Sequence, residues 1–173
     1  MSALAQPIVR LDPISRSEAP VLANLFELYV HDFSELVPVE LKPHGRFDLP
    51  IDERWWSEVG HFPFFLRRGQ ELCGFVLARR GSRVTDDQTA LDVAEFFVVR
   101  GARRQEVGLG AVHALLATLP GRWEIRVRRN NSAALAFWQR ALAPASVQVT
   151  SFEASGASWQ LLRIDTRAVG LGR

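Results

Sequence analysis

The fold is decided by residues 91–142, whose sequence is LDVAEFFVVRGARRQEVGLGAVHALLATLPGRWEIRVRRNNSAALAFWQRAL. The run 91–99 is dense in Val and Phe, which is typical of a strand buried on both faces. Apolar residues at helical spacing follow until Pro120-Gly121, which ends the helix. A second strand over 123–128 and a second helix over 132–142 come next. Strands that alternate with helices predict an α/β or α+β domain with a mixed sheet.

The N-terminal third predicts a short strand, a helix and a loop. The apolar segment Ile8–Leu11 is the strand, and Asp12-Pro13 ends it. The helix starts at Ser15 with Glu18, or at Ser17 with Pro20 in the first turn. One face of this helix is apolar at a spacing of three and four residues, through Leu22, Leu25, Phe26, Tyr29 and Phe33. Residues 41–60 are expected to form a long irregular loop that contains Trp55 and Trp56.

The remaining segments predict strands. An antiparallel hairpin is expected over 62–68 and 72–79, with Gly69-Gln70 in its turn. Two closing strands, over 146–152 and 159–164, flank Gly156. The chain is therefore expected to be one α/β (α+β) domain over residues 1–173. Its mixed, mostly antiparallel sheet of six to seven strands would carry helices on both faces.

Composition excludes several classes of protein. With 47% hydrophobic and 23% charged residues in 173, the chain can bury a sizeable core, and disorder is excluded. Cys73 is the only cysteine, and the four histidines show no paired spacing, so no disulfide and no metal site are expected. The histidines are expected on the surface or in loops. No membrane-spanning run or export signal is found, so a cytoplasmic protein is expected.

The loop after residue 99 has the composition of an anion site. A chain that leaves a buried strand and enters a helix presents unpaired backbone N–H groups at the positive end of the helix dipole. Arg103 and Arg104 add charge there, and glycine lets phosphate oxygens approach the backbone. Two registers fit, Gln105-x-x-Gly108-x-Gly110 and Arg103-x-x-Glu106-x-Gly108. Strand spacing favours the second, which places Glu106 where the first glycine is expected.

These motifs resemble the GNAT superfamily of acyl-CoA-dependent N-acyltransferases. The resemblance rests on the Glu95–Val99 strand, the loop 103–110, and the helix motif Asn131-Ser132-Ala133-Ala134-Leu135-Ala136-Phe137-Trp138. It is strongest for a bacterial branch of predicted acetyltransferases, through Phe96-Phe97-Val98, Pro120-Gly121-Arg122-Trp123-Glu124 and Phe137-Trp138. The resemblance implies acetyl-CoA as co-substrate, with no metal, and a splay between two central parallel strands.

The resemblance also implies which residues hold acetyl-CoA. A backbone N–H of Phe97, Val98 or Val99 would bind the oxyanion, and the strand would hold the pantetheine arm. The pyrophosphate would lie on the loop and helix start formed by Arg103, Arg104, Gln105, Glu106, Val107, Gly108 and Leu109. The following helix would contribute Asn131, Ala134, Phe137 and Trp138.

The catalytic candidates are Glu95, Asp92 and Tyr29. An amine must lose a proton to attack a thioester, and the family often uses a carboxylate in this strand or ordered waters. Glu95 and Asp92 are the acidic candidates, although Glu95 could simply pair with an arginine and Asp92 could be a surface residue at a strand end. The family often places a Tyr where Trp138 stands, and an indole N–H cannot act as an acid. Tyr29, the only tyrosine, is the alternative proton donor.

The expected function is acetyl transfer from acetyl-CoA to a small-molecule or peptide amine by direct attack. Tyr29, His31 and Asp32 could line the acceptor pocket, as could Trp55 and Trp56. The alternative is a catalytically degenerate acyl-CoA-binding or sensor domain of the same fold, suggested by Glu106 and Trp138. An arginine-rich nucleic-acid module is a weaker hypothesis, since 21 basic against 19 acidic residues leave a net charge of only +2. A homodimer stays an open alternative.

Overall fold

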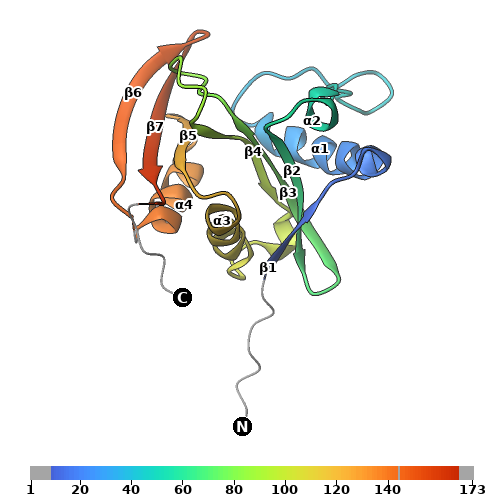
Figure 1. The fold of residues 1–173 in the computed structure, drawn as a ribbon. Helices are drawn as coiled ribbons and strands as arrows, with labels where there is room; N and C mark the ends of the chain where they lie inside the picture. Colours follow the sequence, from blue (N-terminus) through green and yellow to red (C-terminus); the bar gives the residue numbers. More distant parts are fainter. Residues whose placement is uncertain (1–8, 144, 168–173) are drawn as a thin grey trace.

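Seven strands form one mixed sheet in this computed structural model, which describes residues 9–143 and 145–167. Their order across the sheet is β1-β2-β3-β4-β5-β7-β6, and only the β4–β5 pair is parallel (Figure 1). The strands are β1 (Val9–Pro13), β2 (His61–Arg68), β3 (Glu71–Arg80), β4 (Leu91–Val98), β5 (Arg122–Arg128), β6 (Gln148–Ala154) and β7 (Ala157–Asp165). The helices are α1 (Ala19–Phe33), α2 (Arg54–Ser57), α3 (Val107–Thr118) and α4 (Ser132–Leu142). The predicted fold class is confirmed.

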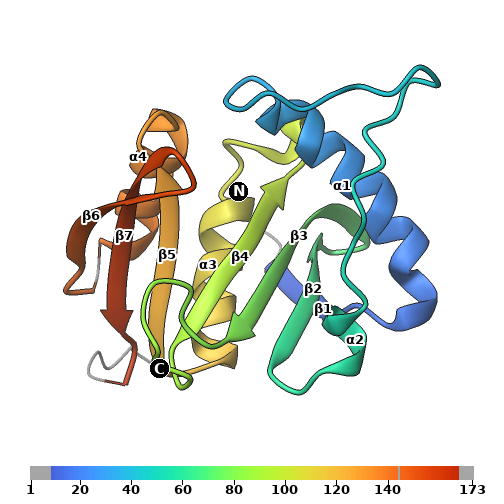
Figure 2. The same ribbon diagram turned by 90° about the horizontal axis from the view of Figure 1, so that it is seen from above.

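The two central strands pair over only three positions and then separate. Their partners are Leu91 with Trp123, Asp92 with Glu124, and Val93 with Ile125. Beyond Val93 and Ile125, β4 and β5 diverge toward their carboxyl ends (Figure 2). The backbone groups that face each other there have no neighbouring strand to pair with, which is unusual inside a sheet. The predicted splay is confirmed.

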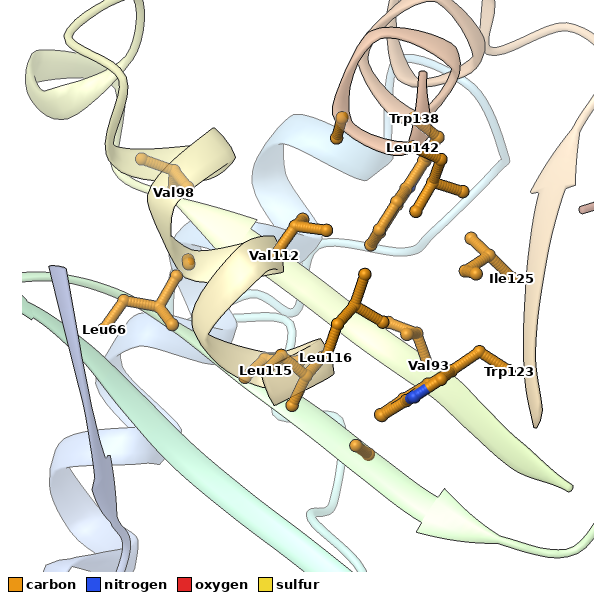
Figure 3. Packing of buried hydrophobic residues seen from close by; sticks show 14 of the residues in the cluster. Leu66, Val93, Val98, Val112, Leu115, Leu116, Trp123, Ile125, Trp138 and Leu142 are labelled. Carbon is orange, nitrogen blue, oxygen red and sulfur yellow. The ribbon is translucent and has the colours of Figure 1, made fainter. Parts of the chain in front are cut away.

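Helices cover both faces of the sheet. On one face, α3 and α4 pack on a core that includes Leu115, Trp123 and Leu142 (Figure 3). On the other face, α1 covers β2, β3 and part of β4 (Figure 2). Leu22 and Leu25 of α1 belong to one buried cluster with Phe75 of β3. The apolar face predicted for α1 is therefore confirmed. Within the described residues, none of the helices has the length and apolar character needed to cross a membrane.

Two sequence expectations about the N-terminal third are corrected. Strand β1 includes Asp12 and Pro13 and ends at Pro13, whereas the expected strand stopped at Leu11; it lies at the sheet edge, where a proline needs no ladder partner for its missing N–H. Trp55 and Trp56 lie in the short helix α2 rather than in irregular loop. The start at Ser15 is confirmed: its backbone N–H donates to the Glu18 carboxylate over 2.9 Å, and a 3-10 turn then leads into α1.

An extra residue in β4 changes which side chains share a face. Leu77 of β3 pairs with Glu95, but the next residue, Ala78, pairs with Val93, so Ala94 is a β-bulge. Strand alternation would place Asp92 and Glu95 on opposite faces. With the bulge, both point to the face that α1 partly covers, where they contact Arg79 and Tyr29 respectively. The bulge therefore brings two carboxyl groups to one face beside the gap in the sheet.

Candidate active site

A cavity of about 680 Å³ occupies the gap between β4 and β5. Its walls include Ile125 and Val127, whose side chains belong to the core under α3 and α4. They also include Arg126 and Arg128, which alternate with those residues along β5. Since alternate residues of a strand point to opposite faces, the cavity reaches both sides of the sheet. An extended acyl group entering from the α3 side could therefore meet an acceptor on the α1 side.

The helix after β4 begins with a backbone arrangement suited to an anion. Arg104 and Glu106 both have φ of 60°, and α3 starts at Val107. The first helical hydrogen bond runs from the Gly110 N–H to the Glu106 carbonyl over 2.9 Å, so the N–H groups of residues 107–109 have no partner within the helix. Successive N–H groups in such a turn form a concave anion-binding site at the positive end of the helix.

The start of α3 at Val107 fits the Arg103-x-x-Glu106-x-Gly108 register. Glu106 takes a left-handed conformation that glycine adopts more readily, which is the property expected of the first glycine in the motif. A Cβ on Gly108 would lie 2.9 Å from the Phe137 ring, so this glycine lets α3 approach α4. Gly110 lies inside the helix, where a Cβ would lie 3.0 Å from Val9. Its role is packing, away from the loop.

Most side chains of the loop are engaged within the protein. Arg103 donates to the Val98 carbonyl over 2.8 Å and forms an ion pair with Asp32 of α1. Gln105 donates to the Gly101 carbonyl over 2.6 Å. Among the described residues, Arg104 has no ion-pair partner, and it is exposed. Arg103 therefore fixes the loop against α1, while Arg104 and the backbone stay available to an anion.

The apolar residues of this loop serve the core. Val107 is 1% exposed and belongs to the cluster under α3, and Leu109 packs against the same cluster. Their side chains hold the first turn of α3 against the sheet. Any contact that they make with a phosphate would therefore involve their backbone N–H groups.

The backbone of β4 offers hydrogen-bond donors to the gap. Val99 donates its N–H to the Cys73 carbonyl of β3 over 2.8 Å. By the alternation of an antiparallel ladder, the Phe97 N–H faces β3 as well, whereas the N–H groups of Phe96 and Val98 face the gap. Of the three oxyanion donors expected from sequence, Phe97, Val98 and Val99, only Val98 directs its N–H into the gap, and none of the three lines the cavity. Phe96, which the sequence did not propose as a donor, does line the cavity.

Helix α4 forms the other wall of the gap. Asn131 caps it, with its side-chain oxygen accepting from the Ala134 N–H over 3.0 Å. Asn131, Ala134 and Trp138 all line the cavity. The ring of Phe96 stacks on that of Phe137 at 5.5 Å between centroids and meets Trp138 edge-on at 5.2 Å. These aromatic contacts link the start of α3, through Gly108 and Phe137, to the cavity.

A carboxyl group and a phenol meet at the floor of the cavity. The Tyr29 hydroxyl of α1 donates to Glu95 Oε2 over 2.5 Å. Burial raises the pKa of Glu95 above its ordinary value, although the Tyr29 hydrogen bond and the nearby Arg126 and Arg79 act in the opposite direction. A carboxylate with a raised pKa is a stronger base than a solvated one. The geometry therefore fits Glu95 to accept a proton from a group in the cavity.

Tyr29 has the opposite character. Burial, and then the adjacent charge of Glu95, raise its pKa above the ordinary value for tyrosine. A phenol with a raised pKa releases its proton less readily, so Tyr29 is a weaker acid than a solvated tyrosine. Its hydroxyl is placed to orient the Glu95 carboxylate.

Asp92 lies at the centre of an ion-pair network. Its side chain is 0% exposed, so the expectation of a surface residue at a strand end is wrong. Arg79 of β3 donates to it over 3.0 Å, and Arg126 of β5 donates over 3.0 and 3.1 Å. Both oxygens are therefore occupied, which fits Asp92 for holding the two arginines rather than for accepting a proton. The network ties β3, β4 and β5 together where the gap begins.

The residues expected around the acceptor are only partly brought together. Trp55 lines the cavity, whereas the Trp56 indole N–H donates to the Ile14 carbonyl over 3.0 Å and is structural. The His31 side chain is 71% exposed outside the cavity walls. Asp32 binds Arg100 and Arg103 instead of facing the cavity.

One histidine differs from the expectation that all four lie on the surface or in loops. His61 begins β2, and its side chain is only 14% exposed. Its ring meets Trp55 edge-on at 5.0 Å between centroids, and it lines the cavity. Sequence reasoning missed His61 because a polar residue at the start of a strand gives no sign of the helix that will cover it.

Cys73 and the arginines are the residues relevant to two other functions, nucleophilic catalysis and nucleic-acid binding. Cys73 is buried within β3 and burial raises the pKa of its thiol, so the expected inert thiol is confirmed. Two of the arginines that suggested nucleic-acid binding form ion pairs within the protein. Arg100 pairs with Asp32, and Arg126 pairs with Asp92 inside the cavity wall.

Comparisons with known proteins agree with this geometry. Residues 22–143 match the family model described as the acetyltransferase (GNAT) family. A search of curated proteins finds no match. An acetyltransferase from Thermus thermophilus is similar in structure, with a TM-score of 0.68 at 19% identity over 92% of this chain and 99% of that one.

Aminoglycoside acetyltransferases are also similar in structure. AAC(6')-Ib, in complex with paromomycin and acetyl-CoA, gives a TM-score of 0.70 at 11% identity over 96% of this chain and 98% of that one. The aminoglycoside N(6')-acetyltransferase of Legionella pneumophila gives 0.66 at 9% identity over 99% and 100%. At such low sequence identities, the structural similarity shows only a shared fold. The match to the family model, in contrast, covers more than half of the chain. The chain therefore belongs to the GNAT acetyltransferase family.

Proposed function

We propose that the protein transfers the acetyl group of acetyl-CoA to a primary amine by direct attack. The observation that carries this proposal is the cavity between β4 and β5, which has unpaired strand N–H groups on one wall and the Glu95–Tyr29 pair at its floor. The turn at the start of α3 is joined to the cavity wall through Gly108, Phe137 and Phe96. These features match the three parts of acetyl-CoA that need recognition: pyrophosphate, amide-containing arm and thioester.

Each part of acetyl-CoA has a group to bind it. The N–H groups of residues 107–109 and the Arg104 guanidinium would hold the pyrophosphate, since both supply donors to an anion. The N–H of Val98, which is nearer the turn, would bind the pantetheine arm in the manner of an added strand. The Phe96 N–H, next to Glu95 in β4, would then face the thioester carbonyl, where negative charge develops during the attack.

The chemical step needs one base and one oxyanion donor. The amine nitrogen attacks the thioester carbon, and its proton passes to the Glu95 carboxylate directly or through a water. The tetrahedral oxyanion is stabilised by the Phe96 N–H, and the C–S bond then breaks to give the N-acetyl product and CoA thiolate. Tyr29 holds Glu95 in position throughout. Trp138 stands where the family often has a tyrosine and cannot protonate the thiolate, so CoA leaves as the anion or takes its proton from solvent.

Transfer is tested by combining calorimetry with thiol release. We expect acetyl-CoA to bind and, with a suitable amine from a panel, to release CoA thiol together with an N-acetyl product. Tight acetyl-CoA binding without turnover on any amine favours the alternative, a non-catalytic sensor of the same fold. A folded protein that fails to bind acetyl-CoA at millimolar concentration contradicts both.

The carboxylate of Glu106 is expected to weaken CoA binding. It stands at the N-terminus of α3, where it repels the pyrophosphate and competes for the positive end of the helix. Replacing it by glycine (Glu106→Gly) is expected to lower the Kd for CoA by about two- to fivefold, the range of a single charge at a helix end. Glu106→Gln, which removes only the charge, should reproduce most of the effect.

Calorimetry with CoA and with pantetheine checks this prediction. Pantetheine lacks the pyrophosphate, so its Kd should be the same for all three proteins. An equal improvement for pantetheine, or no change for CoA, would show that Glu106 does not lie beside the pyrophosphate.

A further inference from the structure

The acceptor side of the cavity is rich in arginine and poor in carboxylate. Five arginines line the cavity, from α2, β3, the β3–β4 loop and β5: Arg54, Arg79, Arg83, Arg126 and Arg128. The lining carboxyl groups are Asp52 and Glu95, and Asp92 lies behind them. Five guanidinium groups against three carboxyl groups leave a surplus of positive charge on the face where an acceptor would bind.

The surplus resides on particular residues. Arg54 forms an ion pair with Asp52, and Arg79 and Arg126 share Asp92. Arg83 and Arg128 take part in no ion pair with a carboxylate within residues 9–143 and 145–167. Arg128 lies over the ring of Trp159 at 5.1 Å from its centroid, which holds its guanidinium at the cavity wall. Arg83 is exposed at the cavity mouth.

The rest of this side is aromatic. Phe26 and Phe33 of α1, Trp55 of α2 and Trp159 of β7 contribute to the walls. Aromatic faces pack against the apolar part of a small molecule, while free guanidinium groups bind carboxylate or phosphate oxygens in bidentate pairs. A polycation would meet like charges at Arg83 and Arg128, and the carboxyl groups among the described lining residues are Asp52, which already pairs with Arg54, and Glu95 at the reaction site.

We propose that the acceptor is a primary amine that also carries a carboxylate or phosphate group, and that Arg83 and Arg128 bind this anionic group. The proposal rests on the acetyltransferase function proposed above and names the class of its acceptor. The acceptor class differs from that of polyamines and aminoglycosides, the amines named for structural neighbours such as a spermidine N-acetyltransferase chimera and AAC(6')-Ib. A positive surrounding also lowers the pKa of a bound ammonium, which favours the neutral amine that attacks.

Matched pairs of amines test the proposal by thiol release from acetyl-CoA. Phenylalanine against phenethylamine measures the value of a carboxylate, and phosphoethanolamine against ethanolamine measures that of a phosphate. Spermidine is the polycation. In at least one pair, we expect kcat/KM for the amine that carries the anionic group to exceed kcat/KM for the amine that lacks it. The expected ratio is about ten- to hundredfold, which corresponds to hydrogen bonds to a charged group. Whichever pair shows the preference identifies the anionic group.

Variants then assign the preference to residues. Arg83→Gln and Arg128→Gln should each reduce the ratio of kcat/KM between the anionic amine and its partner by about tenfold. Arg167→Gln is the matched control, since Arg167 is an exposed arginine paired with Asp165 in the turn after β7 and does not line the cavity. It should leave the ratio unchanged.

The outcomes separate this inference from the function on which it rests. The inference is overturned if the protein prefers spermidine or the partner amines, or if the two arginine variants do not change the ratio. Turnover in these cases still supports the transferase function. The inference is also overturned if the protein binds acetyl-CoA but neither acetylates the anionic amines nor binds them in calorimetry. Absence of acetyl-CoA binding by the folded protein removes the proposed function, and the inference with it.

Discussion

Replacing Glu95 by glutamine is expected to lower kcat by about 10²- to 10⁴-fold, the usual contribution of a general base. The amide keeps the size of the side chain and can still accept from the Tyr29 hydroxyl, but it cannot take a proton from the attacking amine. The KM for acetyl-CoA should change little, because Glu95 lies at the floor of the cavity rather than beside the pyrophosphate. Steady-state kinetics of both proteins measure the effect.

The pH dependence of kcat/KM gives a second measure of the same role. A base must be ionised, so activity should rise with pH through the pKa of Glu95, which burial holds above its ordinary value of 4.5. Tyr29→Phe removes a hydrogen bond that lowers this pKa, so its acid limb should lie at higher pH than that of the wild type. Using amines of different basicity separates this limb from the titration of the amine. An unchanged kcat for Glu95→Gln would show that water or another group acts as the base.

The second large effect is on stability, at the network centred on Asp92. Asp92→Asn should reduce the free energy of unfolding by about 3–5 kcal/mol, the cost of removing one partner of a buried ion pair. The reason is that Arg79 and Arg126, both mostly buried, would lose the carboxylate that they share. Urea denaturation followed by circular dichroism measures the loss.

Asp52→Asn is the matched control for Asp92→Asn. It also removes a carboxylate paired with an arginine, but the side chains of Arg54 and Asp52 are 53% and 43% exposed, and exposed pairs add little to stability. A similar, small loss for both variants would mean that solvent reaches Asp92 and that the network does not hold β3, β4 and β5 together.

Much of this fold was predictable because its signals are local. The Val- and Phe-rich run of β4, the Pro120-Gly121 stop after α3 and the Asn131 cap of α4 act through neighbouring residues. The hairpin of β2 and β3 likewise depends on the adjacent Gly69 turn, where φ is 60°. Elements defined by such short-range chemistry matched the structure.

The floor of the site was less predictable because it depends on contacts between distant strands. The bulge at Ala94 follows from the pairing of β4 with β3 and has no distinctive residue of its own. Without it, Asp92 and Glu95 could not be placed on one face. The positions of Arg79 and Arg126 around Asp92 likewise follow only from strand order. Opposite charges on neighbouring strands were a signal, but it could be used only once the register was known.

The loop before α3 lies between these two cases. Its motif could be found in the sequence, and strand spacing favoured the register with Glu106 at the first glycine position. Glu106 has a left-handed backbone at the start of α3, as that register requires. That Arg103 would turn back to Val98 and Asp32 was not predictable, since the partner on α1 is 71 residues away in sequence.

The most direct measurement of acetyl-CoA recognition is a crystal structure of the protein grown with acetyl-CoA. We predict pyrophosphate oxygens within hydrogen-bonding distance of the N–H groups of residues 107–109. The thioester should lie between β4 and β5, with its carbonyl oxygen toward the Phe96 N–H and its carbon on the side of Glu95. Acetyl-CoA bound elsewhere, or a gap closed by side chains with the ligand excluded, would contradict the proposed transferase.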